Sequence, residues 1–147
     1  MAEIVLRAKL AEAGLDKNVA VDSAGTGDWH VGQGMNPPAR KQLEGRGYDG
    51  SAHRARQFDR SWLAERDLIL AMDASNLATL QRHLARTDQE HRIRLFGDVA
   101  GMDGADVPDP YGGSPEEFAR VLDMLETGMA RLVAQLRAVA GAPAAER

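Results

Sequence analysis

The chain has 147 residues, a formal net charge of −4 and no cysteine. Its 15 arginines and three lysines form no basic run, which argues against nucleic acid as the main partner. No apolar stretch approaches the ~18 residues of a membrane span, so no membrane partner is expected. Without cysteine, these residues contain no disulfide, no cysteine metal site and no thiolate nucleophile. We expect one cytoplasmic domain over residues 1–147, with no metal or cofactor and an Ala-rich tail, 138–147, that frays.

Helical and extended patterns alternate along the chain. Apolar spacing predicts helices over 1–13, 59–65, 74–84 and 115–140, and a helix from Pro37 to Gly45 or Gly47 that Asn36 caps. Strands are predicted over 18–24, 67–73 and 92–96. This order is typical of an α/β fold with a parallel sheet, where ligands bind beyond the carboxyl ends of the strands.

The most distinctive stretch is Val107-Pro-Asp-Pro-Tyr-Gly-Gly113. Prolines on both sides of Asp109 fix two φ angles and restrict the residue before each proline, so the loop is stiff. It holds one carboxyl group beside the phenol of Tyr111, an arrangement that suits general acid chemistry. An ordinary Asp-Pro turn is the alternative, and these residues alone favour that alternative.

Two other segments carry candidate site residues. A glycine-rich loop over 23–30 could cradle phosphate through backbone N–H groups, but it matches no P-loop pattern. Trp29 at its end is either a packing lid or the wall of a ligand site. In the polar segment 51–57, His53 is more typical of a structural histidine than of a base, and Arg54 and Arg56 are more typical of solvated side chains than of phosphate ligands.

Five motifs in order resemble the low-molecular-weight protein tyrosine phosphatases. They are Met1-Ala-Glu3, Asp22-Ser-Ala-Gly-Thr26 with Trp29-His-Val-Gly32, His53-Arg-Ala-Arg-Gln57, Leu70-Ala-Met-Asp-Ala-Ser-Asn-Leu77 and Pro108-Asp-Pro-Tyr111. The resemblance runs from Met1 to about Leu136 and implies a three-layer α/β/α fold whose parallel sheet has the strand order 2-1-3-4.

The resemblance also implies an activity and a set of roles. The activity is hydrolysis of a phosphotyrosine protein or a small aryl phosphate through a cysteinyl-phosphate intermediate. Asp109 would protonate the leaving phenolate and then activate water. Tyr111 and Trp29 would form walls of the slot for the phenyl ring, and Ser23 and His53 would support the phosphate loop by hydrogen bonds. The family often has a second aromatic residue after the tyrosine, where this chain has Gly112.

The chain departs from the family at its start. The family's phosphate loop, C-x5-R-S, runs into S-P-M-A-E, and this sequence begins at that methionine. About 15 residues, one strand and the loop, have no counterpart. We therefore expect no turnover from residues 1–147 and a vacancy in the sheet between the first and second predicted strands. Three interpretations compete: a start codon assigned at an internal methionine, a true remnant that is inactive or binds phosphorylated ligands, and a same-fold arsenate reductase, which needs the same cysteine.

Overall fold

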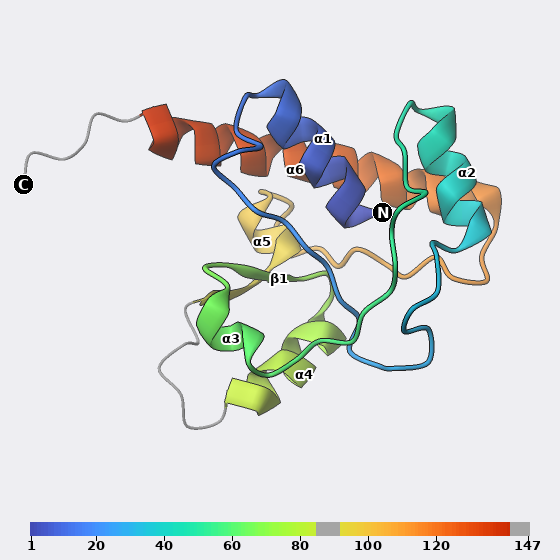
Figure 1. The fold of residues 1–147 in the computed structure, drawn as a ribbon, viewed down its shortest axis with the longest axis horizontal. Coiled ribbons are helices and arrows are strands. Elements are labelled where there is room, and N and C mark those ends of the chain that lie inside the picture. The colour runs from blue at the N-terminus through green and yellow to red at the C-terminus, as the bar shows by residue number, and fades with distance from the viewer. Residues whose placement is uncertain (85–91, 142–147) are drawn as a thin grey trace, which may run out of the picture.

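The computed structural model describes residues 1–84 and 92–141 (Figure 1). Along the chain the elements are α1 (Ala2–Glu12), α2 (Pro37–Gly45), α3 (Trp62–Glu65), β1 (Ile69–Ala71), α4 (Ala74–Leu84), β2 (Ile93–Leu95), α5 (Phe96–Val99) and α6 (Pro115–Gly141). The alternation of helices with a parallel sheet confirms the predicted α/β class.

The sheet described here consists of β1 and β2, which pair in parallel with Ile69 opposite Ile93. Alternate side chains of a strand point to opposite faces. Leu70 therefore packs against the cluster built by α1 and α6, whereas Ile69 and Ala71 belong to a second cluster with side chains of α3 and α4. Figure 1 shows the same division, with α1 and α6 on one side of β1 and α3 and α4 on the other. The predicted three-layer arrangement is confirmed.

The larger cluster lies between α1 and α6. The buried side chains of α1 are Val5, Leu6 and Leu10, and those of α6 include Phe118, Val121, Leu122, Leu125, Met129, Leu132 and Val133. The buried residues of α6 follow the helical spacing from which that helix was predicted. α6 continues to Gly141 and so covers the first four residues of the expected tail, while residues 142–147 lie outside the described part. No helix in the described part is both long and apolar enough to cross a membrane.

The strand predicted over 18–24 is wrong. Its side chains alternate as predicted, with Val19, Val21 and Ser23 half-buried and the residues between them exposed. However, the described residues offer this segment no backbone ladder, and a strand is defined by that pairing. Its polar backbone is bonded in another way, because the Arg7 guanidinium donates to the Val21 carbonyl oxygen at 2.6 Å. The segment is an extended chain bound to α1.

The sequence did not predict α5. The predicted strand over 92–96 ends at Leu95, and Phe96 begins a short helix instead. The Phe96 ring is fully buried, and a Cβ added at Gly128 of α6 would lie 2.5 Å from it. The ring therefore occupies space that only a glycine in the facing helix leaves open.

The start of α2 agrees with the prediction in position but not in bonding. Asn36 is the residue before the helix and Pro37 the first residue in it, as predicted. The Asn36 side chain donates and accepts no capping bond, and its Oδ1 is buried without a partner among the described residues. The helix start thus rests on the preset φ of the prolines rather than on a side-chain cap.

Candidate active site

The loop that carries Asp109 is closed by its own polar groups. The Tyr111 N–H donates to Asp109 Oδ1 at 3.0 Å, and the Gly113 N–H donates to the Pro110 carbonyl oxygen at 2.8 Å. Gly112 has a φ of +77°, which glycine adopts without strain. Asp109 is exposed, so its carboxylate is accessible to a ligand while one of its oxygens orients the turn. The turn-forming and the acid-supplying interpretations of Asp109 are therefore compatible in this geometry.

A hollow of about 280 Å³ opens beside this loop. It lies between Pro108, Asp109 and Pro110 on one side and Glu117, Arg120 and Val121 of α6 on the other. The acid therefore lies at the edge of a concave surface rather than on a flat one.

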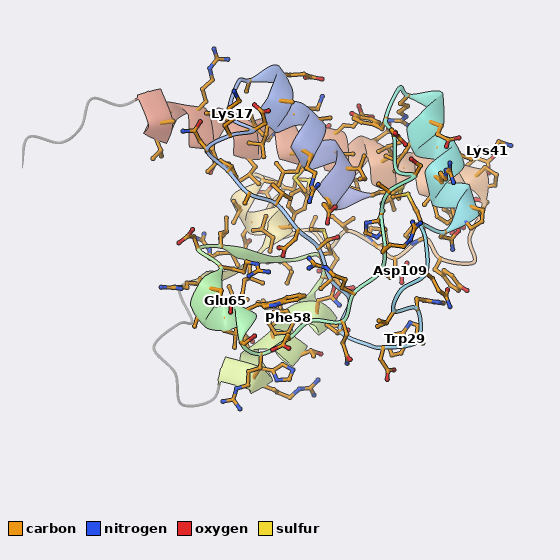
Figure 2. All side chains as sticks on the ribbon, in the orientation of Figure 1. Lys17, Trp29, Lys41, Phe58, Glu65 and Asp109 are labelled. Carbon is orange, nitrogen blue, oxygen red and sulfur yellow. The ribbon has the colours of Figure 1, made fainter. Side chains whose placement is uncertain are left out.

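The glycine-rich loop brings aromatic side chains to the same side of the molecule (Figure 2). Trp29 is 72% exposed and Tyr111 is 63% exposed. The His30 ring packs against Tyr111, with centroids 5.4 Å apart and planes tilted by 43°. The Trp29 indole folds over Gly27, where an added Cβ would lie 1.9 Å from the ring. The two loops thus meet through His30, a residue that the sequence analysis quoted within a motif but gave no role.

The polar segment 51–57 holds the glycine-rich loop in place. Gly25 N–H donates to the Arg56 carbonyl oxygen, and Gly32 N–H donates to the Ala55 carbonyl oxygen, both at 2.8 Å. Ala55 N–H in turn donates to the Gln33 carbonyl oxygen at 2.8 Å. This polar segment therefore supports the backbone of the loop that carries Trp29 and His30.

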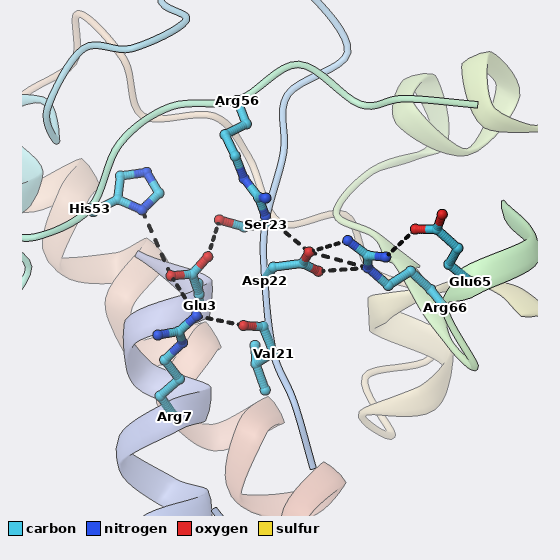
Figure 3. A network of polar contacts seen from close by, with 9 residues as sticks. All are labelled: Glu3, Arg7, Val21, Asp22, Ser23, His53, Arg56, Glu65 and Arg66. Atoms are coloured by element: carbon cyan, nitrogen blue, oxygen red, sulfur yellow. Dashed lines mark hydrogen bonds and ion pairs between the residues drawn. The ribbon is translucent and has the colours of Figure 1, made fainter. Parts of the chain in front are cut away.

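Ser23 and His53 meet at a carboxylate in the first turn of α1 (Figure 3). Ser23 Oγ donates to Glu3 Oε1 at 2.9 Å, and His53 Nδ1 lies 4.0 Å from Glu3 Oε2. Burial lowers the pKa of the His53 imidazole, and the nearby N-terminal amine adds to that effect while Glu3 opposes it. A lowered pKa favours the neutral ring, so its interaction with Glu3 is closer to a polar contact than to an ion pair. Glu3 is a further residue to which the sequence analysis gave no role.

Asp22 points to the opposite side of the same extended segment (Figure 3). Its Oδ2 lies 2.5 Å from Arg66 Nη2 and 2.9 Å from Arg56 Nη2, and both guanidinium groups lie 4.9 Å from the centre of the Trp62 ring. The hydrogen bond from Arg66, followed by the one from Arg56, lowers the pKa of this carboxyl group. Arg56 is thus paired with an acid while its side chain stays 44% exposed, and Ser23 and Asp22 bind one segment to both of its neighbours.

The described residues bring together an exposed carboxylate and exposed aromatic side chains but no thiol. Asp109, Tyr111 and the Trp29 loop are brought together, whereas Ser23 and His53 form a separate group around Glu3. Cysteine is absent from the 147-residue sequence, so a thiolate nucleophile cannot come from these residues. The arrangement can deliver or accept a proton beside a planar ring.

Comparisons with known proteins identify relatives of this chain. A family model described as low molecular weight phosphotyrosine protein phosphatase matches residues 1–140. A low molecular weight protein-tyrosine-phosphatase from Streptomyces coelicolor is 44% identical over 142 residues, covering 93% of this chain and 85% of that protein. A protein of the same description from Bacillus subtilis, YfkJ, is 37% identical over 142 residues, covering 93% and 86%.

A solved structure shows the same fold. The crystal structure of a protein tyrosine phosphatase from Entamoeba histolytica matches with a TM-score of 0.86 at 30% sequence identity, covering 95% of this chain and 88% of that one. The match therefore extends over almost every element described above. On sequence and on structure, the chain belongs to the low molecular weight protein tyrosine phosphatase family.

Proposed function

We propose that residues 1–147 form the acid–base and ring-binding part of a phosphatase site for phosphotyrosine proteins or small aryl phosphates. Asp109 is the general acid and base, and Tyr111 and Trp29 are walls for the phenyl ring. The observation that carries this proposal is the exposed Asp109 carboxylate in a stiff loop whose next aromatic residue packs against the Trp29–His30 loop. Ser23 and His53 have an indirect role: both contact Glu3 and so help to fix the first turn of α1.

The proton transfers follow from the chemistry of the substrate. In the first step the phosphoryl group passes to the cysteine thiolate that the family's mechanism uses, the bond between phosphorus and the phenolic oxygen breaks, and the Asp109 carboxyl group donates its proton to that oxygen. In the second step water attacks phosphorus and displaces the thiolate, inorganic phosphate leaves, and the Asp109 carboxylate accepts a proton from that water. General acid catalysis of this kind contributes typically about 10²–10⁴-fold to the rate. The flanking prolines keep the carboxylate in place through both steps.

Residues 1–147 alone should not hydrolyse aryl phosphates. The family's mechanism needs a thiolate to accept the phosphoryl group, and these residues contain no cysteine. An assay of the purified 147-residue chain with p-nitrophenyl phosphate, with and without vanadate, checks this. A vanadate-sensitive rate above the uncatalysed one would contradict this prediction.

The role of Asp109 is tested in a longer protein. We would fuse the segment of the Streptomyces coelicolor relative that precedes the matched region to Met1, and compare the fusion with its Asp109→Asn form. The substitution should leave KM near its starting value and lower kcat about 10²–10⁴-fold for a phenol that leaves poorly, with a smaller loss for activated phenols. Asp103→Asn is the matched control, because Asp103 is exposed on a neighbouring loop at a φ of 52° that asparagine tolerates. Equal rates across leaving groups for both Asp109 forms would remove this residue from the mechanism.

A further inference from the structure

The loop over residues 106–113, called the acid loop here because it carries Asp109, is bound to the rest of the fold by two consecutive residues just before Asp109. Asp106 Oδ1 accepts a hydrogen bond from the Ala74 N–H at 3.0 Å, and the Val107 N–H donates to the Met72 carbonyl oxygen at 2.8 Å. The Val107 side chain is 4% exposed and belongs to the larger core cluster. The two bonds therefore attach the acid loop to the residues on either side of Asp73, where β1 ends and α4 begins.

The hydrogen bond to Asp106 gives the Ala74 N–H an acceptor that its own helix cannot supply. Ala74 is the first residue of α4, and the first N–H groups of a helix have no partner within the helix. A carboxylate is favoured there because the helix dipole places partial positive charge at that end. Asp73 serves the same end separately, since its Oδ1 accepts from the Asn76 N–H at 2.7 Å. Two acids thus bond to one helix start, but only Asp106 belongs to the acid loop.

The anchor is joined stiffly to the catalytic group. Only Pro108 separates Val107 from Asp109, and its ring fixes its φ. Val107 and Asp109 each precede a proline, so both are restricted to extended conformations. Few soft dihedral angles remain between the anchor and the Asp109 carboxylate, and a shift at Asp106 therefore moves Asp109.

We propose that Asp106 is the positioning residue of this site: its carboxylate clamps the acid loop to the start of α4 and so sets where Asp109 stands. The inference rests on the proposed role of Asp109 for its functional meaning, while the clamp itself is a property of the fold. If Asp106 were only a helix cap, removing its carboxylate would destabilise α4 without changing the position of the loop beyond Val107.

Hydrogen exchange on the 147-residue chain separates these two possibilities without requiring turnover. Asp106→Ala should speed exchange of the Ala74 and Val107 amides about 5–10-fold, the loss typical of a helix cap. It should also speed exchange of the Tyr111 amide, which reports the Asp109 turn. Asp106→Asn keeps an oxygen acceptor at the same place and should restore all three amides to within about twofold of the starting protein.

Asp73→Ala is the matched control. It removes a cap from the same helix and should expose the Asn76 amide while leaving the Val107 and Tyr111 amides unchanged. The proposal is overturned if Asp73→Ala loosens Tyr111 as much as Asp106→Ala does, or if Asp106→Ala leaves Tyr111 unchanged.

The fused protein supplies the functional measurement. Asp106→Ala should lower kcat without raising KM, most strongly for poor leaving groups, and Asp106→Asn should recover most of the rate. If Asp109→Asn slows the fusion but Asp106→Ala leaves kcat normal, the positioning role of Asp106 is wrong and the role of Asp109 stands. If Asp109→Asn is fully active while the exchange measurements still show that Asp106 protects the loop, the proposed function is wrong and the positioning role of Asp106 stands.

Discussion

Different forces stabilise two regions of the molecule: the helical face, built by α1 and α6, and the loop side, built by the loops that carry the candidate site residues. Between α1 and α6, buried aliphatic and aromatic side chains interlock with almost no polar contact. On the loop side, segment 22–34 is joined to segment 51–58 by backbone hydrogen bonds and the Asp22–Arg56 ion pair, and segment 106–113 is bound to the junction of β1 and α4 by Asp106 and Val107. Apolar burial is non-directional and supplies most of the stability, whereas hydrogen bonds are directional and small in net free energy. The helical face should therefore govern whether the protein folds, and the loop side should govern where the candidate catalytic groups lie.

The largest effect is expected on the helical face. Leu122 of α6 has no exposed surface and lies within the larger cluster. Leu122→Ala should lower the free energy of unfolding by about 2–5 kcal/mol, because it leaves a cavity in addition to the lost burial. Urea unfolding measures this, with Thr127→Ala on the exposed side of the same helix as a control that should stay within about 0.5 kcal/mol. A cost below about 1 kcal/mol for Leu122→Ala would mean that this face does not carry the stability.

The same contrast explains which elements could be predicted from the sequence. α4 was predicted at its observed bounds and α1 and α6 within one residue at each end, because their apolar spacing is the cause of their packing. The segment over 18–24 has the alternation of a strand, and its faces were predicted correctly, but pairing depends on a neighbour that alternation does not reveal. α5 was missed because the space for the Phe96 ring depends on Gly128, which lies 32 positions further along the chain.

Prediction of the site divides in the same way. Asp109 and its stiff loop could be found locally, because prolines act on adjacent residues. Tyr111 was found in the same loop, and Trp29 was found as either a packing lid or a ligand wall, but their role as walls of the phenyl-ring slot came from the resemblance to the family. Glu3 and Asp106 were missed because each acts by a hydrogen bond to a residue at least 20 positions away. The presence of Glu3 in a quoted motif was the one sequence signal for it.

A smaller and pH-dependent effect is expected at Asp22. Its pKa is lowered in the folded state, so the unfolded chain binds more protons as the pH falls below about 4, the ordinary value for aspartate. The stabilisation is therefore present above that value and is lost as the pH falls through the folded pKa. Because the pair is partly exposed, it should contribute about 1 kcal/mol or less.

Urea unfolding of Asp22→Asn and of the starting protein at pH 6 and pH 3 measures this contribution. The gap between the two proteins should be largest at pH 6 and should shrink at pH 3. Asp16→Asn, on an exposed residue in the turn that precedes this segment, is the control. A gap that is constant with pH would show that Asp22 acts through its shape rather than through its charge.

The smallest effect on stability, and the most informative one for the site, is expected at His30. Its ring contacts Tyr111, which is 63% exposed, so His30→Ala should change the free energy of unfolding by no more than about 0.5 kcal/mol. The Tyr111 ring protons should nevertheless shift in the NMR spectrum, because the neighbouring ring that orients them is lost. His30→Phe keeps an aromatic ring and should restore most of that shift, while Val31→Ala, on the adjacent exposed residue, should leave Tyr111 unchanged. Unmoved Tyr111 signals in His30→Ala would mean that the two loops are placed independently. A large loss of stability would mean instead that the loop side shares the folding role assigned here to α1 and α6, and the contrast between the two regions would fail.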